Sequence, residues 1–101
     1  MTQRMKIEDR KAQLLTHGIK LARRGNYAQV TRKEVALSAG VSEALLSLHF
    51  KTMAGYRKAL MVHAVATRDV AIVAQGLFAR DKLARNAPVD LKQLALASIT
   101  A

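Results

Sequence analysis

The spacing of hydrophobic residues predicts a chain built from helices. Between Ile7 and Arg24 an apolar stripe repeats at helical spacing, and most of the basic residues in this segment lie outside it. Gly25 and Asn26 follow, and both tolerate the left-handed backbone conformation that ends helices. The first predicted helix therefore ends near Arg24.

Two short helices are predicted next. Thr31 and Glu34 form a capping box, in which the hydroxyl and the carboxylate each accept from a free backbone N–H group. Gly40 ends this helix after about two turns. Ser42 is a suitable N-cap for the second short helix, which carries Leu46 and Phe50 as core positions.

The remaining sequence predicts further helices. Thr52 can cap a helix whose apolar pattern extends to Phe78, and the pattern fits either one long helix or two helices broken near residues 67–69. Asp90 is predicted to cap a last helix that reaches Ile99. The predicted fold is all-α, with five or six helices and no strand. A head over residues 1–52 precedes a helical dimerisation region over residues 53–101.

Charge and composition narrow the classes of function. The net charge of +10, from 17 basic and 7 acidic residues, favours binding to nucleic acid or to anionic surfaces. The absence of cysteine excludes disulfides and thiolate chemistry and fits a reducing cytoplasm. The first ten residues do not form a signal peptide, and Arg68 and Asp69 interrupt the apolar stretch 59–79, so no membrane span is expected. We predict a cytoplasmic, nucleoid-associated protein.

The two short helices have the dimensions of a helix-turn-helix motif. Gly40 permits the sharp turn, and Val41 is apolar, so it can fill the angle between the helices. Ala36 is small where the helices approach each other. Ser42 begins the second helix, whose N-terminal end faces the major groove in such motifs. The motif indicates binding to double-stranded DNA.

This part of the chain resembles the DNA-binding domain of the tetracycline-repressor (TetR) family. The resemblance is carried by residues 27–36 (YAQVTRKEVA), by 39–42 (AGVS), and by Leu46 with His49-Phe50, and it covers about residues 8 to 62. It implies a three-helix head and a homodimer that represses transcription from an inverted-repeat operator. Family members carry a ligand-binding domain about twice as long as the chain after Tyr56, so no small-molecule effector is expected.

Three positions depart from the family pattern. Leu45 stands where the family usually has a small hydroxyl residue, Ser47 where it has a tyrosine, and Met53 where it has a lysine. These positions face DNA in the family, so the sequence that is read should differ. The resemblance and the charge pattern together give these candidate DNA-binding residues: Thr31, Arg32, Lys33, Ser42, Glu43, Ala44, Leu45, Ser47, Leu48, His49 and Lys51.

The candidates have different expected roles. The hydroxyl groups of Thr31 and Ser47 can donate to phosphates, and the three basic residues can neutralise phosphates beside the groove. Leu45 or Ala44 can pack on a thymine methyl, although Leu45 or Leu48 can instead pack on the first helix or on a partner chain. His49 fits either a DNA contact or a partly buried turn.

Other functions are also compatible with the sequence. Charge alone could make the chain a nonspecific nucleoid or RNA-binding protein. The basic amphipathic helices could also serve a protein-interaction module such as an antitoxin or adaptor, or a binder of anionic membranes. No catalytic set, phosphate loop or cofactor motif is present, and His17, His49 and His63 lack metal-site spacing, so neither an enzyme nor a metal protein is expected.

Overall fold

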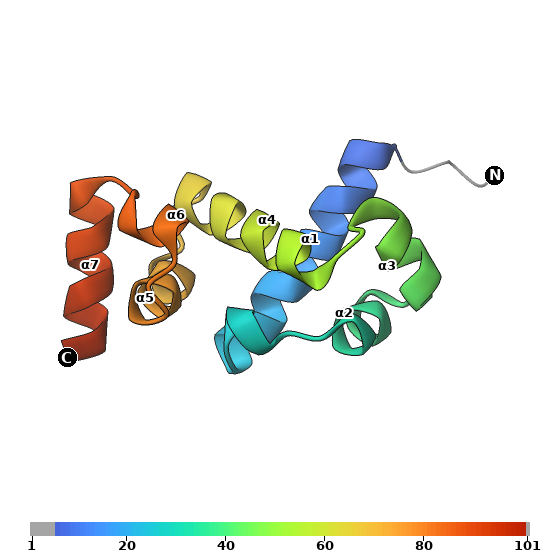
Figure 1. The fold of residues 1–101 in the computed structure, drawn as a ribbon, viewed down its shortest axis with the longest axis horizontal. Helices are drawn as coiled ribbons and strands as arrows, with labels where there is room; N and C mark the ends of the chain where they lie inside the picture. Colours follow the sequence, from blue (N-terminus) through green and yellow to red (C-terminus); the bar gives the residue numbers. More distant parts are fainter. Residues whose placement is uncertain (1–5, 101) are drawn as a thin grey trace.

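Helices account for nearly all of the regular structure in residues 6–100, the part of the chain that the computed structural model describes. Within that part lie seven α-helices, one 3₁₀ turn and no strand, so the all-α class is confirmed and the prediction of five or six helices is wrong. Residues 1–5 of the predicted head and residue 101 of the predicted dimerisation region lie outside the described part of the chain. The elements are α1 (Ile7–Arg24), η1 (Tyr27–Gln29), α2 (Arg32–Ala39), α3 (Glu43–His49), α4 (Met53–Ala66), α5 (Val70–Phe78), α6 (Lys82–Arg85) and α7 (Val89–Thr100) (Figure 1).

Local capping fixes the ends of α2 and the start of α3 as predicted, whereas α1 ends at Gly25 with a φ of −139° and not with the left-handed conformation expected there. The capping box at α2 is present, with Glu34 N donating to Thr31 Oγ1 at 3.3 Å and Thr31 N donating to Glu34 Oε1 at 3.1 Å. Gly40 has a φ of +69°, the left-handed conformation that glycine adopts without steric penalty. Ser42 Oγ accepts from Leu45 N at 3.0 Å and so caps α3. Phe50 follows α3 as its C-cap.

The long apolar pattern after Thr52 forms two helices. Thr67 ends α4, and Arg68 takes a left-handed conformation with a φ of 57°. Asp69 then caps α5 by accepting from Ile72 N at 3.2 Å. A similar arrangement follows at Arg80 and Asp81, where Asp81 Oδ1 accepts from Leu83 N at 2.8 Å at the start of the unpredicted helix α6.

The prediction for the last helix is wrong at its first residue. Asp90 lies inside the first turn of α7, which begins at Val89, so it is not the N-cap. The carbonyl of Pro88 already accepts from Lys92 N at 3.0 Å, so the helix is entered at Pro88, two residues before Asp90. The carboxylate of Asp90 instead accepts from Arg68 Nη2 at 2.6 Å.

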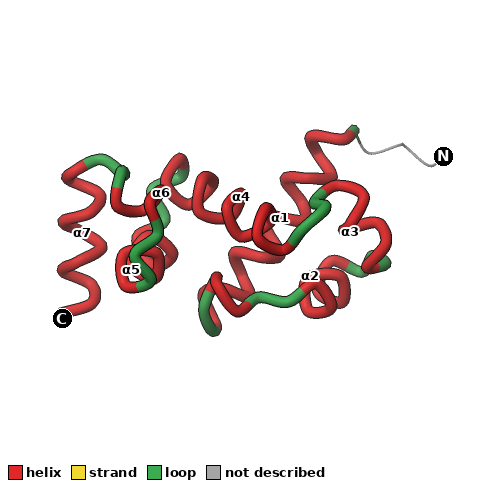
Figure 2. The backbone as a smooth tube through the Cα atoms, in the orientation of Figure 1, coloured by secondary structure: helices red, strands yellow, loops and turns green. Residues whose placement is uncertain are grey.

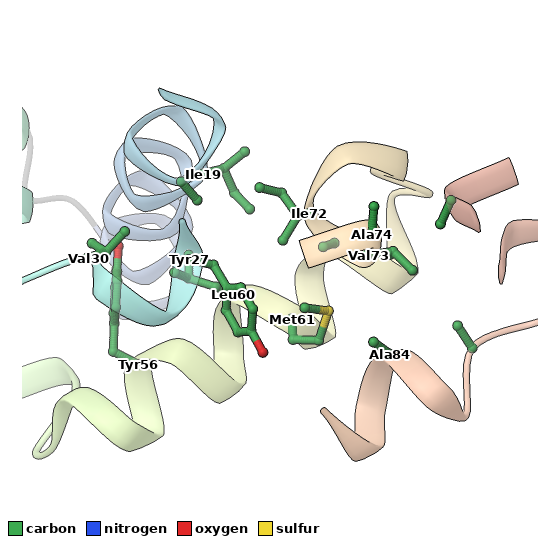
Figure 3. Packing of buried hydrophobic residues seen from close by; sticks show 14 of the residues in the cluster. Ile19, Tyr27, Val30, Tyr56, Leu60, Met61, Ile72, Val73, Ala74 and Ala84 are labelled. Atoms are coloured by element: carbon green, nitrogen blue, oxygen red, sulfur yellow. The ribbon is translucent and has the colours of Figure 1, made fainter. Parts of the chain in front are cut away.

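One hydrophobic core joins the predicted head to the predicted dimerisation region. Leu14 of α1 and Leu46 of α3 belong to the same buried cluster as Leu60 of α4, Ile72 of α5 and Leu91 of α7. Figure 3 shows labelled side chains of α1, α4, α5 and α6 gathering between these helices. The chain therefore buries its apolar surface as a single unit.

The molecule is elongated, with extents of 48 × 22 × 21 Å. The helices α2 and α3 lie at one end, and α7 lies at the other, where it packs mainly on α5 (Figures 1 and 2). The predicted helix-turn-helix and the C-terminal helix are thus held far apart by α1 and α4.

Candidate nucleic-acid interface

The face of α3 that remains exposed is the centre of the candidate interface. Leu46 is completely buried and anchors the helix on the core. Ser42, Glu43, Ala44 and Leu48 are exposed, and Leu48 keeps 75% of its surface accessible. Three further predicted residues on this helix are half-buried, namely Leu45, Ser47 and His49. The sequence left open which leucine would be exposed, and the packing of α3 selects Leu48 over Leu45.

A side-chain hydrogen bond joins the two helices of the motif. Arg32 Nη1, at the start of α2, donates to Ser47 Oγ on α3, and Ser47 Oγ in turn donates to the carbonyl of Glu43 at 3.0 Å. The hydroxyl proton of Ser47 is therefore directed into its own helix. Ser47 thus lies where it orients the guanidinium of Arg32, which is half-buried between the helices.

The first turn of α2 carries an exposed hydroxyl and an exposed cation. Thr31 and Lys33 are both exposed, and the hydroxyl of Thr31 donates to Glu34 Oε1 at 2.8 Å. This bond adds to the two side chain–backbone bonds of the capping box, so the first role of Thr31 is to begin the helix. The backbone N–H groups of Arg32 and Lys33 precede the first possible intrahelical bonds and point out of the helix end. They provide donors for a phosphate.

The connection from α3 to α4 carries Lys51, which is exposed. It follows Phe50, whose ring packs edge-on against Tyr56 with centroids 5.0 Å apart. Lys11 Nζ of α1 lies 5.9 Å from the centroid of the Phe50 ring. The aromatic pair thus brings a second lysine, which the sequence did not predict, to the C-terminal side of α3.

The packing of α1 fixes the position of α2. His17 Nδ1 and Ser38 Oγ lie 2.8 Å apart, in hydrogen-bond contact across the two helices. On α2, Leu37 is 73% exposed, and the sequence did not single it out. In the sequence, Leu37 differs from Val35 and Ala36 only in its position on the helix. Its exposure can be inferred only when the buried face of α2 is known.

Two tyrosines support this end of the molecule without facing the interface. The hydroxyl of Tyr56 donates to the carbonyl of Leu14 at 2.6 Å, and burial raises the pKa of this phenol. The hydroxyl of Tyr27 donates to Asp81 Oδ2 at 2.7 Å, and burial followed by this bond raises its pKa. Both phenols are neutral at physiological pH and act as structural hydrogen-bond donors.

Residues 6–100 contain neither a metal site nor a membrane span. In that range no three His, Cys, Asp or Glu side chains gather closely enough to hold a metal ion. None of the helices described there has the length and hydrophobicity needed to cross a membrane. Around α2 and α3, by contrast, the exposed Lys33 and Lys51 lie near the N-termini of two helices.

Comparison of the chain with protein-family models, with curated proteins and with solved structures finds no match. A proposal for the function therefore depends on the residues and geometry around α2 and α3.

Proposed function

We propose that this protein is a sequence-specific DNA-binding repressor that acts as a homodimer on an inverted-repeat operator. The observation that carries the proposal is the α2–α3 pair, in which Gly40 turns the chain and Ser42 starts a helix with one free face. Such a pair suits insertion of the second helix into the major groove. The resemblance of residues 27–50 to the TetR DNA-binding pattern supports the same conclusion.

Base contacts in this proposal come from the exposed face of α3. Leu48 and Ala44 are apolar and exposed, and an apolar side chain in the major groove packs on the methyl group of thymine. Glu43 can accept from the amino group of cytosine. These contacts would give sequence preference.

Phosphate contacts come from residues that flank the same face. Arg32 is oriented by Ser47, while Lys33 and Lys51 are exposed on either side of α3. Basic side chains that bind DNA phosphates release the counterions condensed on the DNA. The affinity for DNA should therefore fall steeply as the salt concentration is raised. The rest of the +10 net charge adds attraction that does not depend on sequence.

Dimerisation is proposed from the apolar surface of α7. This helix buries Leu91 and Ala95, but Val89, Leu94 and Leu96 are each more than half exposed. Phe78 at the end of α5 adds a ring that is 82% exposed. A helix that is apolar on most sides is normally buried, and a second copy of the chain would bury it. A dimer would present two α3 helices, and occupation of a promoter would exclude polymerase.

The test is binding to duplexes tiled across the DNA upstream of the protein's own gene, with random duplex as competitor at physiological salt. The expected result is one fragment bound about a thousandfold or more above random duplex. Leu48→Ala should reduce that preference, and Ile7→Ala is the matched control, since Ile7 is 63% exposed and lies outside the motif. Equal loss in both variants would contradict the role of α3.

Two other results would favour other functions. Equal affinity for every duplex, including random DNA, would favour a nonspecific nucleoid protein. No binding to DNA even at low salt would favour a protein-interaction module.

A further inference from the structure

A cleft with a positive lining lies between η1, α4 and α6, and none of its lining residues is among the candidate DNA-binding residues. Its volume is about 360 Å³, which is within the range of about 300–1,000 Å³ typical of small-molecule sites. Ala28, Ala54 and Leu83 contribute apolar wall. The cleft can therefore accept the apolar part of a small organic molecule.

Three cations and one carboxylate line this cleft. Arg57 and Lys58 come from α4, and Lys82 is the first residue of α6. Asp81 is the one acidic residue in the lining, and both of its oxygens already accept hydrogen bonds, from the Tyr27 hydroxyl at 2.7 Å and from Leu83 N at 2.8 Å. The lining therefore has an excess of two positive charges and no carboxylate oxygen left without a donor.

The guanidinium of Arg57 is incompletely paired within the described part of the chain. Its Nη2 donates to the carbonyl of Val30 at 3.1 Å, whereas its buried Nε has no hydrogen-bond partner there. A guanidinium has five N–H donors, and buried donors are normally satisfied. The Val30 contact holds Arg57 at the cleft wall, and because its Nε is buried, a ligand would accept hydrogen bonds from the terminal Nη nitrogens of the guanidinium.

We propose that this cleft binds a small organic anion, with an apolar body against Ala28, Ala54 and Leu83 and a terminal phosphate or carboxylate on Arg57, Lys58 and Lys82. Arg57 supplies the directional hydrogen bonds, because a guanidinium matches the geometry of phosphate and carboxylate oxygens. The two lysines supply charge. The site does not depend on DNA recognition.

The position of the cleft gives its ligand contact with both parts of the fold. Tyr27 and Ala28 belong to η1, which leads into α2, whereas Lys82 and Leu83 belong to α6. The Tyr27–Asp81 hydrogen bond already links these elements. A bound anion would add a further link between η1 and α6.

The experiment is a titration of the full-length protein with phenyl phosphate, followed by the backbone amide resonances of Ala28, Ala54 and Leu83 at constant ionic strength. A Kd of about 1 mM is expected for a ligand with about eleven non-hydrogen atoms. Benzyl alcohol, which has the ring without the charge, should bind at least about tenfold more weakly, since it cannot make charge-assisted hydrogen bonds.

Variants separate the cleft from general attraction to a basic protein. Arg57→Lys keeps the charge and should raise the Kd about tenfold, because it removes the fork of donors. Lys82→Ala, at an exposed position, should raise it about threefold. Lys20→Ala removes an exposed charge from α1 outside the cleft and should leave the Kd unchanged. Amide spectra establish that each variant is folded.

Three results would overturn the proposal. One is absence of saturable shifts at the cleft amides up to about 20 mM phenyl phosphate, well above the expected Kd. Another is an equal loss of affinity in Lys82→Ala and Lys20→Ala. The third is displacement of phenyl phosphate by random duplex DNA with shifts at the same amides, which would assign the cleft to the DNA backbone instead of a small molecule.

Discussion

Gly18 of α1 lies against Tyr56 and Leu60 of α4, and replacing it with alanine should strongly destabilise the fold. A Cβ at this position would lie 2.1 Å from the Tyr56 hydroxyl oxygen and 2.8 Å from Leu60 Cδ2. Both side chains are completely buried, so neither can move into solvent. The new methyl group must therefore displace Tyr56 from the Leu14 carbonyl.

The size of the effect follows from three contributions. Overpacking of a close-packed core costs about 3 kcal/mol at the upper end of its usual range, which suits so short a contact. Loss of the Tyr56–Leu14 hydrogen bond adds about 1 kcal/mol. The higher helix propensity of alanine returns about 1 kcal/mol. The expected loss is about 3 kcal/mol, a large share of the roughly 5–15 kcal/mol typical of a domain.

The assay is urea denaturation followed by circular dichroism. With a slope near 1.5 kcal/mol/M, Gly18→Ala should lower the midpoint by about 2 M. Tyr56→Phe is the partner for a double-mutant cycle and should itself cost about 1 kcal/mol. Tyr56→Phe removes the oxygen nearest the new methyl group. The free energy of unfolding of the double variant should therefore fall by about 2 kcal/mol less than the sum of the two single losses. Strictly additive losses would refute the proposed contact.

Two further predictions concern the helix ends. Arg80 has a φ of 60°, so Arg80→Gly should stabilise the protein by about 1 kcal/mol and raise its Tm by about 4–8 °C in thermal unfolding. The control Lys20→Gly, inside α1, should destabilise the protein by a similar amount. A lower Tm for Arg80→Gly would contradict this prediction. The hydrogen bond from Arg68 lowers the pKa of the Asp90 carboxyl, so Arg68→Ala should raise that pKa toward 3.8 in an NMR titration. Since the pKa of Asp90 is lower in the folded than in the unfolded protein, its pairing with Arg68 stabilises the protein above about pH 4, and this stabilisation is lost on acidification. An unchanged Asp90 pKa in Arg68→Ala would show that Arg68 does not cause the lowered pKa.

The sequence predicted the elements whose signals are local. The caps at Thr31, Gly40 and Ser42 act on backbone groups within four residues, and each has the predicted geometry. The start of α7 was wrong because the carboxylate of Asp90 does not cap its own helix and instead accepts from Arg68, 22 positions away in the sequence. The break after α4 could not be decided from pattern, since it depends on Asp69, which caps α5 and also pairs with Arg23 of α1 at 2.7 Å.

The candidate interface was predictable as a segment but not in its detail. The choice of Leu48 as the exposed leucine depends on how Leu46 anchors α3 to helices distant in sequence. The Arg32–Ser47 bond joins residues 15 positions apart, and no spacing rule connects them. The positive cleft was also missed, because Arg57 and Lys82 meet only through the fold.

The most direct test of the proposed function is selection of bound duplexes from a random pool by the purified protein, which works without a known operator sequence. The predicted result is enrichment of an inverted repeat whose half-sites lie about one helical turn apart, as expected of a dimer that places two α3 helices in successive major grooves. Recovery of duplexes without any enriched sequence would contradict sequence-specific recognition by α3.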